Sequence, residues 1–274
     1  MPSEDERLKM AELPRITIVT PSFNQVSFIA DTLKSVLDQG YPNLEYIVMD
    51  GGSTDGSVEV IRHHADRLAY WASQPDQGQA DAITRGFARA TGEVMTWLNS
   101  DDILMPGALN LVGSVFATHP QIQWLTGWPT NLDETGAIVR KGLPTGYYRS
   151  LIRAGWYHGR GLGFIRQEGT FWLRELWIRV GGALDRRRYY SMDADLWRRF
   201  AEHAPLVAIR APLAAFRVQP HRKSAAIESY YQEAGIRVPA ATRLAMLPLR
   251  VVLAFLSRWT TPRLVYSNGW QYEQ

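Results

Sequence analysis

The sequence predicts an α/β fold built on a doubly wound, mostly parallel sheet. Short β-branched runs alternate with segments of helical periodicity from residue 15 to about residue 128. Several of these runs end in polar loops that are rich in glycine and small hydroxyl residues. Such alternation favours parallel strands, because the chain must cross over before it can run again in the same direction. Ligands of sheets of this type bind beyond the carboxyl ends of the strands.

The predicted elements follow one another with few irregular residues between them. Apolar residues spaced three and four apart predict helices, and continuous β-branched runs predict buried strands. The predicted strands lie at residues 15–20, 44–49, 68–72, 94–98 and 122–126. The predicted helices lie at residues 27–38, from about 57, at 79–90 and at 106–118, and a hairpin is expected at 131–141.

The stretch GEVMTWLNSDD, residues 92–102, is the most informative segment. Its buried strand runs directly into two adjacent acids, Asp101 and Asp102, at the end of the strand where ligands bind. Two carboxylates suit Mg²⁺ or Mn²⁺, and such an ion suits a substrate that carries phosphates. The alternative is that the polar residues ahead of Pro106 cap the next helix.

The loop GGSTDG after the second strand offers a further carboxylate, Asp50. This loop lacks the GxGxxG spacing of dinucleotide-binding loops, and no GxxxxGK[ST] motif occurs in the chain. At a strand end, Asp50 can accept hydrogen bonds from a base or a ribose. The alternative is a tight turn in which Asp55 caps the following helix, and both roles are compatible because different acids perform them.

Composition limits the classes of function. Hydrophobic residues at 46% and charged residues at 21% are typical of globular proteins. A net charge of +3 without a basic aromatic stretch gives no reason to expect a nucleic-acid partner. The chain contains no cysteine, which rules out disulfides and agrees with a cytoplasmic location. Residues 1–14 are charged and lack the apolar segment of a signal peptide, so we expect an N-terminal extension.

Three ordered motifs resemble the family 2 glycosyltransferases, which have the GT-A fold. They are TPSFN at residues 20–24, SVLDQGYPNLEYIVMDGGSTDGS at 35–57 and SQPDQGQADAITRGFARATGEVMTWLNSDD at 73–102. The likeness extends over roughly the first 225 residues and is greatest to bacterial O-antigen and exopolysaccharide sugar transferases. It implies a Rossmann-like mixed sheet with a helical C-terminal appendage. It also implies inverting transfer of one sugar from a UDP- or dTDP-linked donor to a glycan or lipid-linked glycan.

Carried over position by position, the resemblance implies a donor site and a metal site. The implied donor-binding residues are Pro21, Asn24, Asp50, Asp76, Gly78 and Asp101. Asp50 would contact the base, and Asp101 and Asp102 would hold the divalent cation, Mn²⁺ or Mg²⁺. Asn99 stands where the family usually has a further acid, so the motif leaves open which of the two aspartates binds the ion directly.

The segment MDADLWRRF, residues 192–200, contains the acid that the resemblance identifies as the catalytic base, Asp193. A sugar hydroxyl is a poor nucleophile, so the reaction needs a carboxylate that takes its proton. Asp195 is the competing candidate, and helix capping is the alternative role for either acid. Glu168 is an additional acid in a region that contacts the donor sugar in the family.

The segment FRVQPHRKS, residues 216–224, resembles the closing element of the family. A histidine there often reaches the metal or the phosphates, but this chain has Gln219 at that position. Gln is a weaker metal ligand than His. Arg217 and His221 are therefore candidate phosphate or metal contacts, and an ordinary surface position is the alternative for His221.

The chain is expected to comprise four parts. These are an N-terminal extension (1–14), a nucleotide-sugar-binding half (15–128), an acceptor-binding and catalytic half of the same domain (129–224), and a helical, basic and apolar tail (225–274). The apolar run in the tail is shorter than the roughly 20 residues that a membrane span needs. Two roles are open for it: peripheral contact with the inner face of the cell membrane, or packing on the catalytic domain.

Two rival functions use similar features. A sugar-nucleotide nucleotidyltransferase has a similar fold and metal, but it would carry a basic, glycine-rich loop after the first strand, and TPSFNQ contains no Lys or Arg. The second rival is a non-catalytic carbohydrate-binding relative. It would have no need of the acids listed above, Asp50, Asp101, Asp102 and Asp193.

Overall fold

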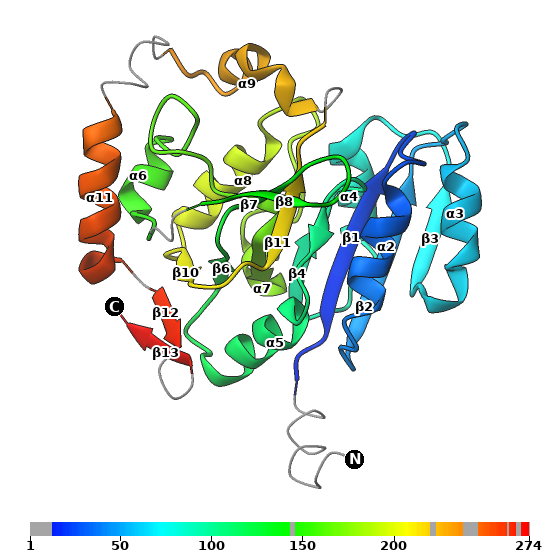
Figure 1. Cartoon of the computed structure of the whole chain (residues 1–274), viewed down its shortest axis with the longest axis horizontal. Coiled ribbons are helices and arrows are strands. Elements are labelled where there is room, and N and C mark those ends of the chain that lie inside the picture. The colour runs from blue at the N-terminus through cyan, green and yellow to red at the C-terminus, as the bar shows by residue number, and fades with distance from the viewer. Residues whose placement is uncertain are drawn as a thin grey trace, which may run out of the picture.

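A nine-stranded sheet runs through the molecule, with strand order β13-β12-β10-β6-β9-β4-β1-β2-β3 (Figure 1). The computed structural model describes residues 13–142, 146–219, 223–237, 246–261, 263–266 and 270–273. The strands of this sheet are β1 (Ile16–Ser22), β2 (Leu44–Asp50), β3 (Tyr70–Ser73), β4 (Val94–Trp97), β6 (Trp124–Thr126), β9 (Thr170–Leu173), β10 (Val207–Ile209), β12 (Arg263–Tyr266) and β13 (Trp270–Glu273). A second sheet, in the order β5-β11-β7-β8, contains β5 (Ile103–Leu104), β7 (Thr130–Leu132), β8 (Ile138–Lys141) and β11 (Ala214–Arg217).

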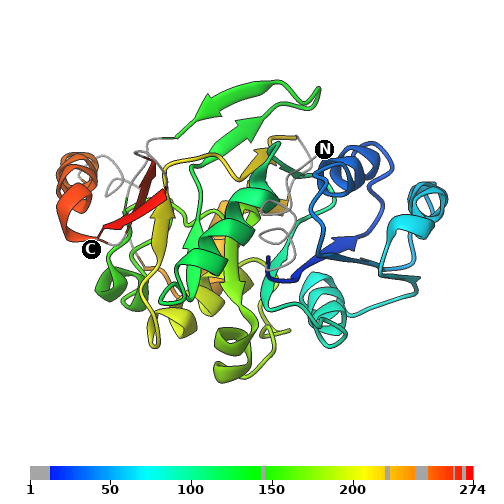
Figure 2. The same ribbon diagram turned by 90° about the horizontal axis from the view of Figure 1, so that it is seen from below.

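Helices cover both faces of the large sheet (Figure 2). The helices are α2 (Ile29–Leu37), α3 (Ser57–His63), α4 (Gln79–Phe87), α5 (Ala108–Thr118), α6 (Arg149–Arg153), α7 (Arg174–Arg179), α8 (Met192–Ala201), α9 (Ile227–Glu233) and α11 (Leu247–Thr260). Short 3₁₀ turns lie at Ala65–Arg67, Gln167–Gly169 and Lys223–Ala225. One core cluster packs α2, α3 and α5 against the sheet, and a second packs α4, α7 and α8 against it.

The predicted doubly wound, mostly parallel sheet is confirmed. β1 pairs in parallel with β2 and β4, and β2 pairs in parallel with β3, so four carboxyl ends meet at one edge. The predicted hairpin is also present, with the Asp133 carboxylate accepting hydrogen bonds from the backbone of Thr135 and Ala137 in its turn. The helix expected from Pro106 begins at Ala108 behind Gly107, without a side-chain cap. The alternative prediction, that the polar residues after β4 cap this helix, is therefore wrong.

Two features of the second half differ from the expectation. β9 comes from a region where the sequence predicted no strand, yet it inserts antiparallel between β4 and β6 and makes the sheet mixed. The tail is not helical throughout, because β12 pairs in parallel with β10 and β13 adds an antiparallel edge. Both differences have the same cause: these strands have only four residues each, and they are defined by distant partners.

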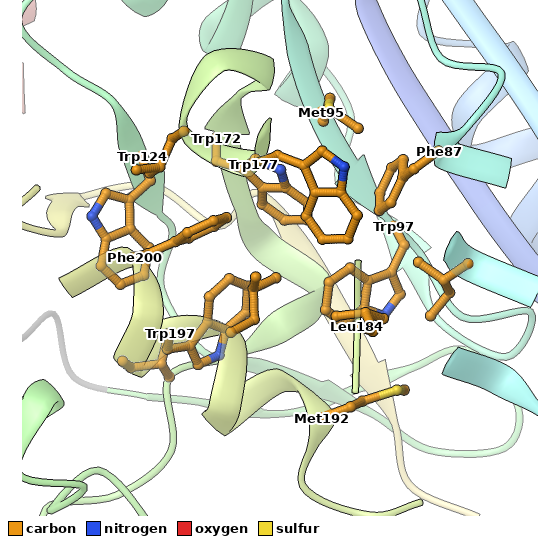
Figure 3. Packing of buried hydrophobic residues seen from close by; sticks show 14 of the residues in the cluster. Phe87, Met95, Trp97, Trp124, Trp172, Trp177, Leu184, Met192, Trp197 and Phe200 are labelled. Atoms are coloured by element: carbon orange, nitrogen blue, oxygen red, sulfur yellow. The ribbon is translucent and has the colours of Figure 1, made fainter. Parts of the chain in front are cut away.

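A cluster of aromatic rings fills the core beneath α8 (Figure 3). The tryptophans are Trp97, Trp124, Trp172, Trp177 and Trp197, and their ring centroids lie 5.5 to 6.5 Å from neighbouring tryptophans. Trp97 ends β4 and stacks on Trp197 of α8, with 6.0 Å between centroids and 9° between planes. This contact fixes α8 relative to the acidic turn that follows β4, because close-packed rings do not slide without cost.

We expect replacement of Trp172 by alanine to lower the free energy of unfolding by about 3–5 kcal/mol, because it leaves a large cavity among the rings. Trp172 is fully buried. Trp156→Ala is the matched control, since Trp156 is 38% exposed, and it should cost less than about 1 kcal/mol. Urea denaturation of both variants measures the difference, and equal losses would contradict the packing role.

Candidate active site

The carboxyl ends of β1 to β4 bring most of the predicted donor residues to one edge of the sheet. Ser22 pairs with Asp50, and Asp50 pairs with Ser73 on the next strand. Pro21 is buried within β1 and shapes the strand end rather than facing outward. The sequence-predicted positions in the first half therefore gather where ligands of parallel sheets bind.

Asp50 is almost fully buried and its carboxylate is used inside the loop. Its Oδ2 accepts hydrogen bonds from the backbone N–H groups of Gly52 and Ser53 and from the Ser73 hydroxyl at 2.6 Å. Its Oδ1 accepts a bond from the Ser53 hydroxyl at 2.6 Å. These four bonds commit Asp50 to shaping the loop, so any contact with a base would compete with them. Asp55 accepts a bond from the Ser57 N–H at the start of α3, but the N-cap position itself is Gly56 and carries no side-chain cap.

Phe23 and Asp76 form a rim beside this loop. A Cβ atom on Gly51 would lie 3.0 Å from the Asp76 Oδ2 and 3.3 Å from the Phe23 ring, so glycine is what lets the two side chains come close. The Phe23 side chain is 60% exposed, and the other Asp76 oxygen accepts a bond from the Gly78 N–H at 2.7 Å. An exposed ring next to a carboxylate can stack on a base and accept its N–H.

Asn24 lies on the same rim with a φ of 51°. Its Oδ1 accepts a bond from the Thr54 N–H, and its own N–H donates to the Ser53 hydroxyl. Asn24 therefore joins the end of β1 to the loop after β2. Sequence reasoning missed Phe23, although an aromatic residue directly after a strand-ending proline and serine is a usable signal.

The two acids after β4 differ in environment. Asp102 is fully buried, and its oxygens accept bonds from the Arg217 N–H at 2.9 Å and the Asn99 amide at 3.1 Å. Asp101 is partly exposed and accepts a bond from the Gln219 amide at 2.6 Å. The described contacts thus favour Asp101 as the acid that faces a ligand and Asp102 as the acid that holds the turn.

Arg217 is the buried centre that organises this turn. Its guanidinium donates to the carbonyl oxygens of Asp101 and Glu134 and to the carboxylate of Asp31, while its backbone N–H donates to Asp102. Only 1% of its side chain is exposed. The predicted phosphate contact of Arg217 finds no support here, because its donors are already used by the protein. His221 lies outside the described residues.

Burial raises the pKa of three carboxyl groups that interact electrostatically at the site. Burial, followed by the charges of Asp101 and Glu168, raises the pKa of Asp102 well above its ordinary value. Burial likewise raises the pKa of Asp101 and that of Glu168. The Glu168 Oε1 is buried and accepts no hydrogen bond from the part of the chain that the structure describes. The site therefore holds more negative charge than the nearby protein groups neutralise.

A chain of hydrogen bonds connects Asp102 to Lys223, in the segment that resembles the closing element of the family. The Asn99 amide donates to Asp102, the Gln79 amide donates to Asn99 at 2.6 Å, and the Lys223 ammonium donates to Gln79 at 2.8 Å. The same ammonium lies 3.9 Å from the centroid of the Tyr189 ring. Asn99 therefore has a defined task where the family usually places an acid, and Gln79 is a site residue that sequence reasoning missed.

Asp193 lies in the first turn of α8 on the other side of Lys223. Burial raises the pKa of Asp193 to about 6, and the charge of Lys223 opposes this shift. Asp195, the competing candidate, instead pairs with Arg199 at 3.0 Å and with Arg188 at 3.5 Å. Within the residues that the structure describes, no arginine forms an ion pair with Asp193, and a carboxylate with a pKa near neutrality is the better proton acceptor.

Glu233 at the end of α9 positions the start of α8, and sequence reasoning missed it. Its carboxylate accepts bonds from the backbone N–H groups of Tyr189, Tyr190 and Ser191, at 2.6 to 2.9 Å. It also accepts a bond from the Ser191 hydroxyl at 2.8 Å. Because Asp193 follows two residues later, Glu233 anchors the backbone that carries it. Nothing in the sequence around Glu233 distinguishes it from a surface acid.

The acid pair fits a divalent cation that takes part of its shell from elsewhere. Within the described ranges, no three His, Asp or Glu side chains gather closely enough to enclose a metal. Mg²⁺ and Mn²⁺ suit one or two carboxylates together with substrate phosphates and water. The raised pKa values of Asp101 and Asp102 show that positive charge would be stabilising at this position.

Comparison with known proteins identifies related sequences and related structures. The family model "Glycosyl transferase family 2" matches residues 17–167. An uncharacterized glycosyltransferase of Mycobacterium tuberculosis is 39% identical over 94 residues, which cover 34% of this chain and 36% of that protein. The putative glycosyltransferase EpsE of Bacillus subtilis is 25% identical over 195 residues, covering 69% and 67%.

A third relative is the GalNAc(5)-diNAcBac-PP-undecaprenol beta-1,3-glucosyltransferase of Campylobacter jejuni, 32% identical over 102 residues, 36% of this chain and 33% of that protein. The chain thus matches about a third of the length of most of these relatives. Two solved structures share the fold. S. aureus TarS 1–349 in complex with UDP-GlcNAc has a TM-score of 0.63 at 13% identity, covering 88% of this chain and 72% of that one.

The mannosyltransferase PcManGT of Pyrobaculum calidifontis, in complex with GDP-Man and Mn²⁺, has a TM-score of 0.60 at 19% identity, covering 89% and 74%. These likenesses confirm the predicted GT-A fold.

We expect Asp101→Asn to raise the melting temperature in the absence of divalent cations, and to raise it more near about pH 7 than near about pH 3.5. Burial raises the pKa of Asp101 in the folded protein above its ordinary value, so its ionisation costs stability as pH rises through the raised pKa. Thermal melts of both proteins in EDTA measure the difference. A gain that is equal at both pH values would contradict the raised pKa of Asp101.

Proposed function

This chain belongs to glycosyl transferase family 2, whose model matches residues 17–167 of its 274, and from that premise we propose an inverting sugar transferase. It transfers a single sugar from a UDP- or dTDP-linked donor to a hydroxyl of a glycan or lipid-linked glycan in surface polysaccharide synthesis. One observation carries the proposal: a hydrogen-bonded chain runs from Asp102 through Asn99 and Gln79 to Lys223, whose charge acts on the buried carboxyl group of Asp193.

The first half of the chain binds the donor. Phe23 stacks on the base, and Asp76 accepts a hydrogen bond from it, since both side chains line the space that Gly51 leaves open. Asp50 and Asn24 hold the loops that form this space. When bound, a divalent cation, Mn²⁺ or Mg²⁺, neutralises charge on the diphosphate leaving group. Asp101 and Asp102 are the residues that would hold it.

The second half activates the acceptor. With a pKa of about 6, the Asp193 carboxylate is ionised at neutral pH and takes the proton of the attacking hydroxyl. Attack from the face opposite the nucleotide inverts the anomeric centre in one step. Lys223 keeps positive charge beside the Asp193 carboxylate. It also joins the segment at residues 216–224 to the donor half through its hydrogen bond with Gln79.

The proposed acceptor and location follow from the relatives. The Campylobacter relative is named for an acceptor linked to undecaprenol, and EpsE is a putative glycosyltransferase that matches 69% of this chain. We place the protein in the cytoplasm, in peripheral contact with the inner face of the cell membrane through its C-terminal tail. None of the described helices is long and apolar enough to cross a bilayer.

The two rivals have less support. Family membership over residues 17–167 argues against a nucleotidyltransferase. A non-catalytic binding protein would have no use for a buried carboxylate at Asp193 with a raised pKa. Metal-dependent hydrolysis of a nucleotide sugar separates the two possibilities.

Replacing Asp193 with asparagine should lower turnover by at least about 100-fold and leave donor binding nearly unchanged, because only the proton acceptor is lost. The wild-type rate should fall about tenfold per pH unit below the Asp193 pKa of about 6. Asp195→Asn is the control and should keep turnover within a few-fold of wild type. Full activity of the Asp193 variant rejects the assignment of the base.

A panel of UDP-, dTDP- and GDP-sugars identifies the donor. A ligand that binds only the folded protein raises its melting temperature, so a matching UDP- or dTDP-sugar should do so when Mn²⁺ is present. Asp101→Asn should remove most of the Mn²⁺-dependent part of the shift. Stabilisation by GDP-sugars alone would refute the proposed donor class, and no stabilisation by any member would refute the transferase.

A further inference from the structure

The C-terminal helix α11 presents an apolar face to the outside. It packs beyond α6 at the edge of the molecule, where Figure 1 shows it in orange-red and Figure 2 shows it again on the periphery. Six large apolar side chains of this helix are 43% to 64% exposed: Leu247, Leu249, Val251, Val252, Phe255 and Leu256. A contiguous row of this kind on one helix is unlike the scattered apolar residues that ordinary surfaces carry.

Two polar side chains of α11, those of Arg250 and Ser257, point the other way. Arg250 donates to the carbonyl oxygens of Gly161 and Gly159, at 2.5 and 2.8 Å. Ser257 is 1% exposed and accepts a hydrogen bond from the Gly146 N–H at 2.9 Å. A surface helix in water normally buries its apolar stripe and exposes its polar one. The polarity of α11 is inverted, so its outer face suits an apolar environment.

Charge decides which environment. From residue 234 to residue 272 the sequence has five arginines, Arg237, Arg243, Arg250, Arg258 and Arg263, and neither Asp nor Glu. Two copies of the chain meeting through α11 would bring two tails of net positive charge together, which opposes self-association. An anionic lipid surface supplies the opposite charge and an apolar layer at once.

We propose that α11 lies in the plane of an anionic membrane surface, with Val251 and Val252 at the centre of its lipid-facing side. The helix has 14 residues, about 21 Å at 1.5 Å per residue, so it rests in the interface rather than spanning it. This rests on the peripheral membrane contact proposed above and deepens it, because it names the helix, its face and the class of lipid. Lipid contact itself requires neither donor nor acceptor.

Contacts beneath α11 connect the lipid-facing helix to the catalytic side. The segment that Arg250 binds, around Gly159, packs closely against Tyr231 of α9, and the Arg160 guanidinium lies 4.2 Å from the centroid of the same ring. α9 ends in Glu233, which anchors the start of α8. A protein docked through α11 would therefore hold the acceptor side in a fixed orientation to the bilayer, as a lipid-linked acceptor requires.

The test compares two double variants that change charge and exposed apolar surface equally. Val251→Glu with Val252→Glu alters the outer face of α11. Val139→Glu with Ile178→Glu makes the same change on β8 and α7, at side chains that are both 58% exposed. The full-length proteins are sedimented with phosphatidylglycerol–phosphatidylcholine vesicles and with pure phosphatidylcholine vesicles, without any substrate.

Wild type and the control should bind the phosphatidylglycerol vesicles, more weakly at high salt, and the α11 variant should bind at least about tenfold less. Wild type should bind pure phosphatidylcholine poorly.

Circular dichroism checks that each variant is folded, and wild-type binding with its salt dependence tests the proposal even if a variant is not. Equal binding by both variants, or no wild-type binding, overturns the proposal. The proposal is also overturned if the wild type is a dimer in gel filtration, the α11 variant is a monomer, and neither protein binds vesicles. Because no sugar transfer is measured, these outcomes are independent of the catalytic assignment.

Discussion

The accumulation of negative charge at the end of β4 is the constraint on which the rest of the site depends. Burial raises the pKa of Asp101, Asp102 and Glu168, and the charges of Asp101 and Glu168 raise that of Asp102 further, so the protein must supply compensating donors or accept a cation. It supplies Arg217 from β11 and Gln219 from the segment after it. The distant second half of the chain is thus required to complete a turn that belongs to the first half. The remaining excess of charge is what makes this edge suitable for a cation with a diphosphate.

Rigid packing holds the acids after β4 in a fixed position relative to the helix that carries Asp193. The stacked pair Trp97 and Trp197 joins the strand that carries the acids to the helix that carries Asp193, from the interior side. On the ligand side, the chain from Asn99 through Gln79 to Lys223 joins the same two parts by hydrogen bonds. Two independent connections, one apolar and one polar, hold the donor and acceptor sides at a defined separation. A transferase needs this, because attack is productive only when the reacting atoms are aligned.

The first half of the site was predictable from sequence because its signals are local. Strand ends, a glycine-rich loop and the acids after β4 are written in consecutive residues, and Asp50 and Asp101 stand at the strand ends where they were expected. The task of Asp50 was not predictable, since its four donors come from a loop fold and a neighbouring strand. β9 and β10 are short and depend on partners far away in the sequence, so periodicity could not reveal them. Glu233 was missed for the same reason: only its contacts distinguish it.

The orientation of α11 shows a second limit of what sequence periodicity can predict. A hydrophobic period identifies which residues of a helix share a face, but it does not say whether that face turns inward. Here hydrogen bonds to the segment that follows β8 fix the inward side. Arg250 donates to the carbonyl oxygens of Gly159 and Gly161, Ser257 accepts from the Gly146 N–H, and the Leu253 carbonyl oxygen accepts from the Tyr148 hydroxyl. Once those contacts are made, the apolar side has to face outward. The arginines that are abundant in the tail then favour an anionic surface over a second protein copy, because repulsion between like charges acts only in the latter case.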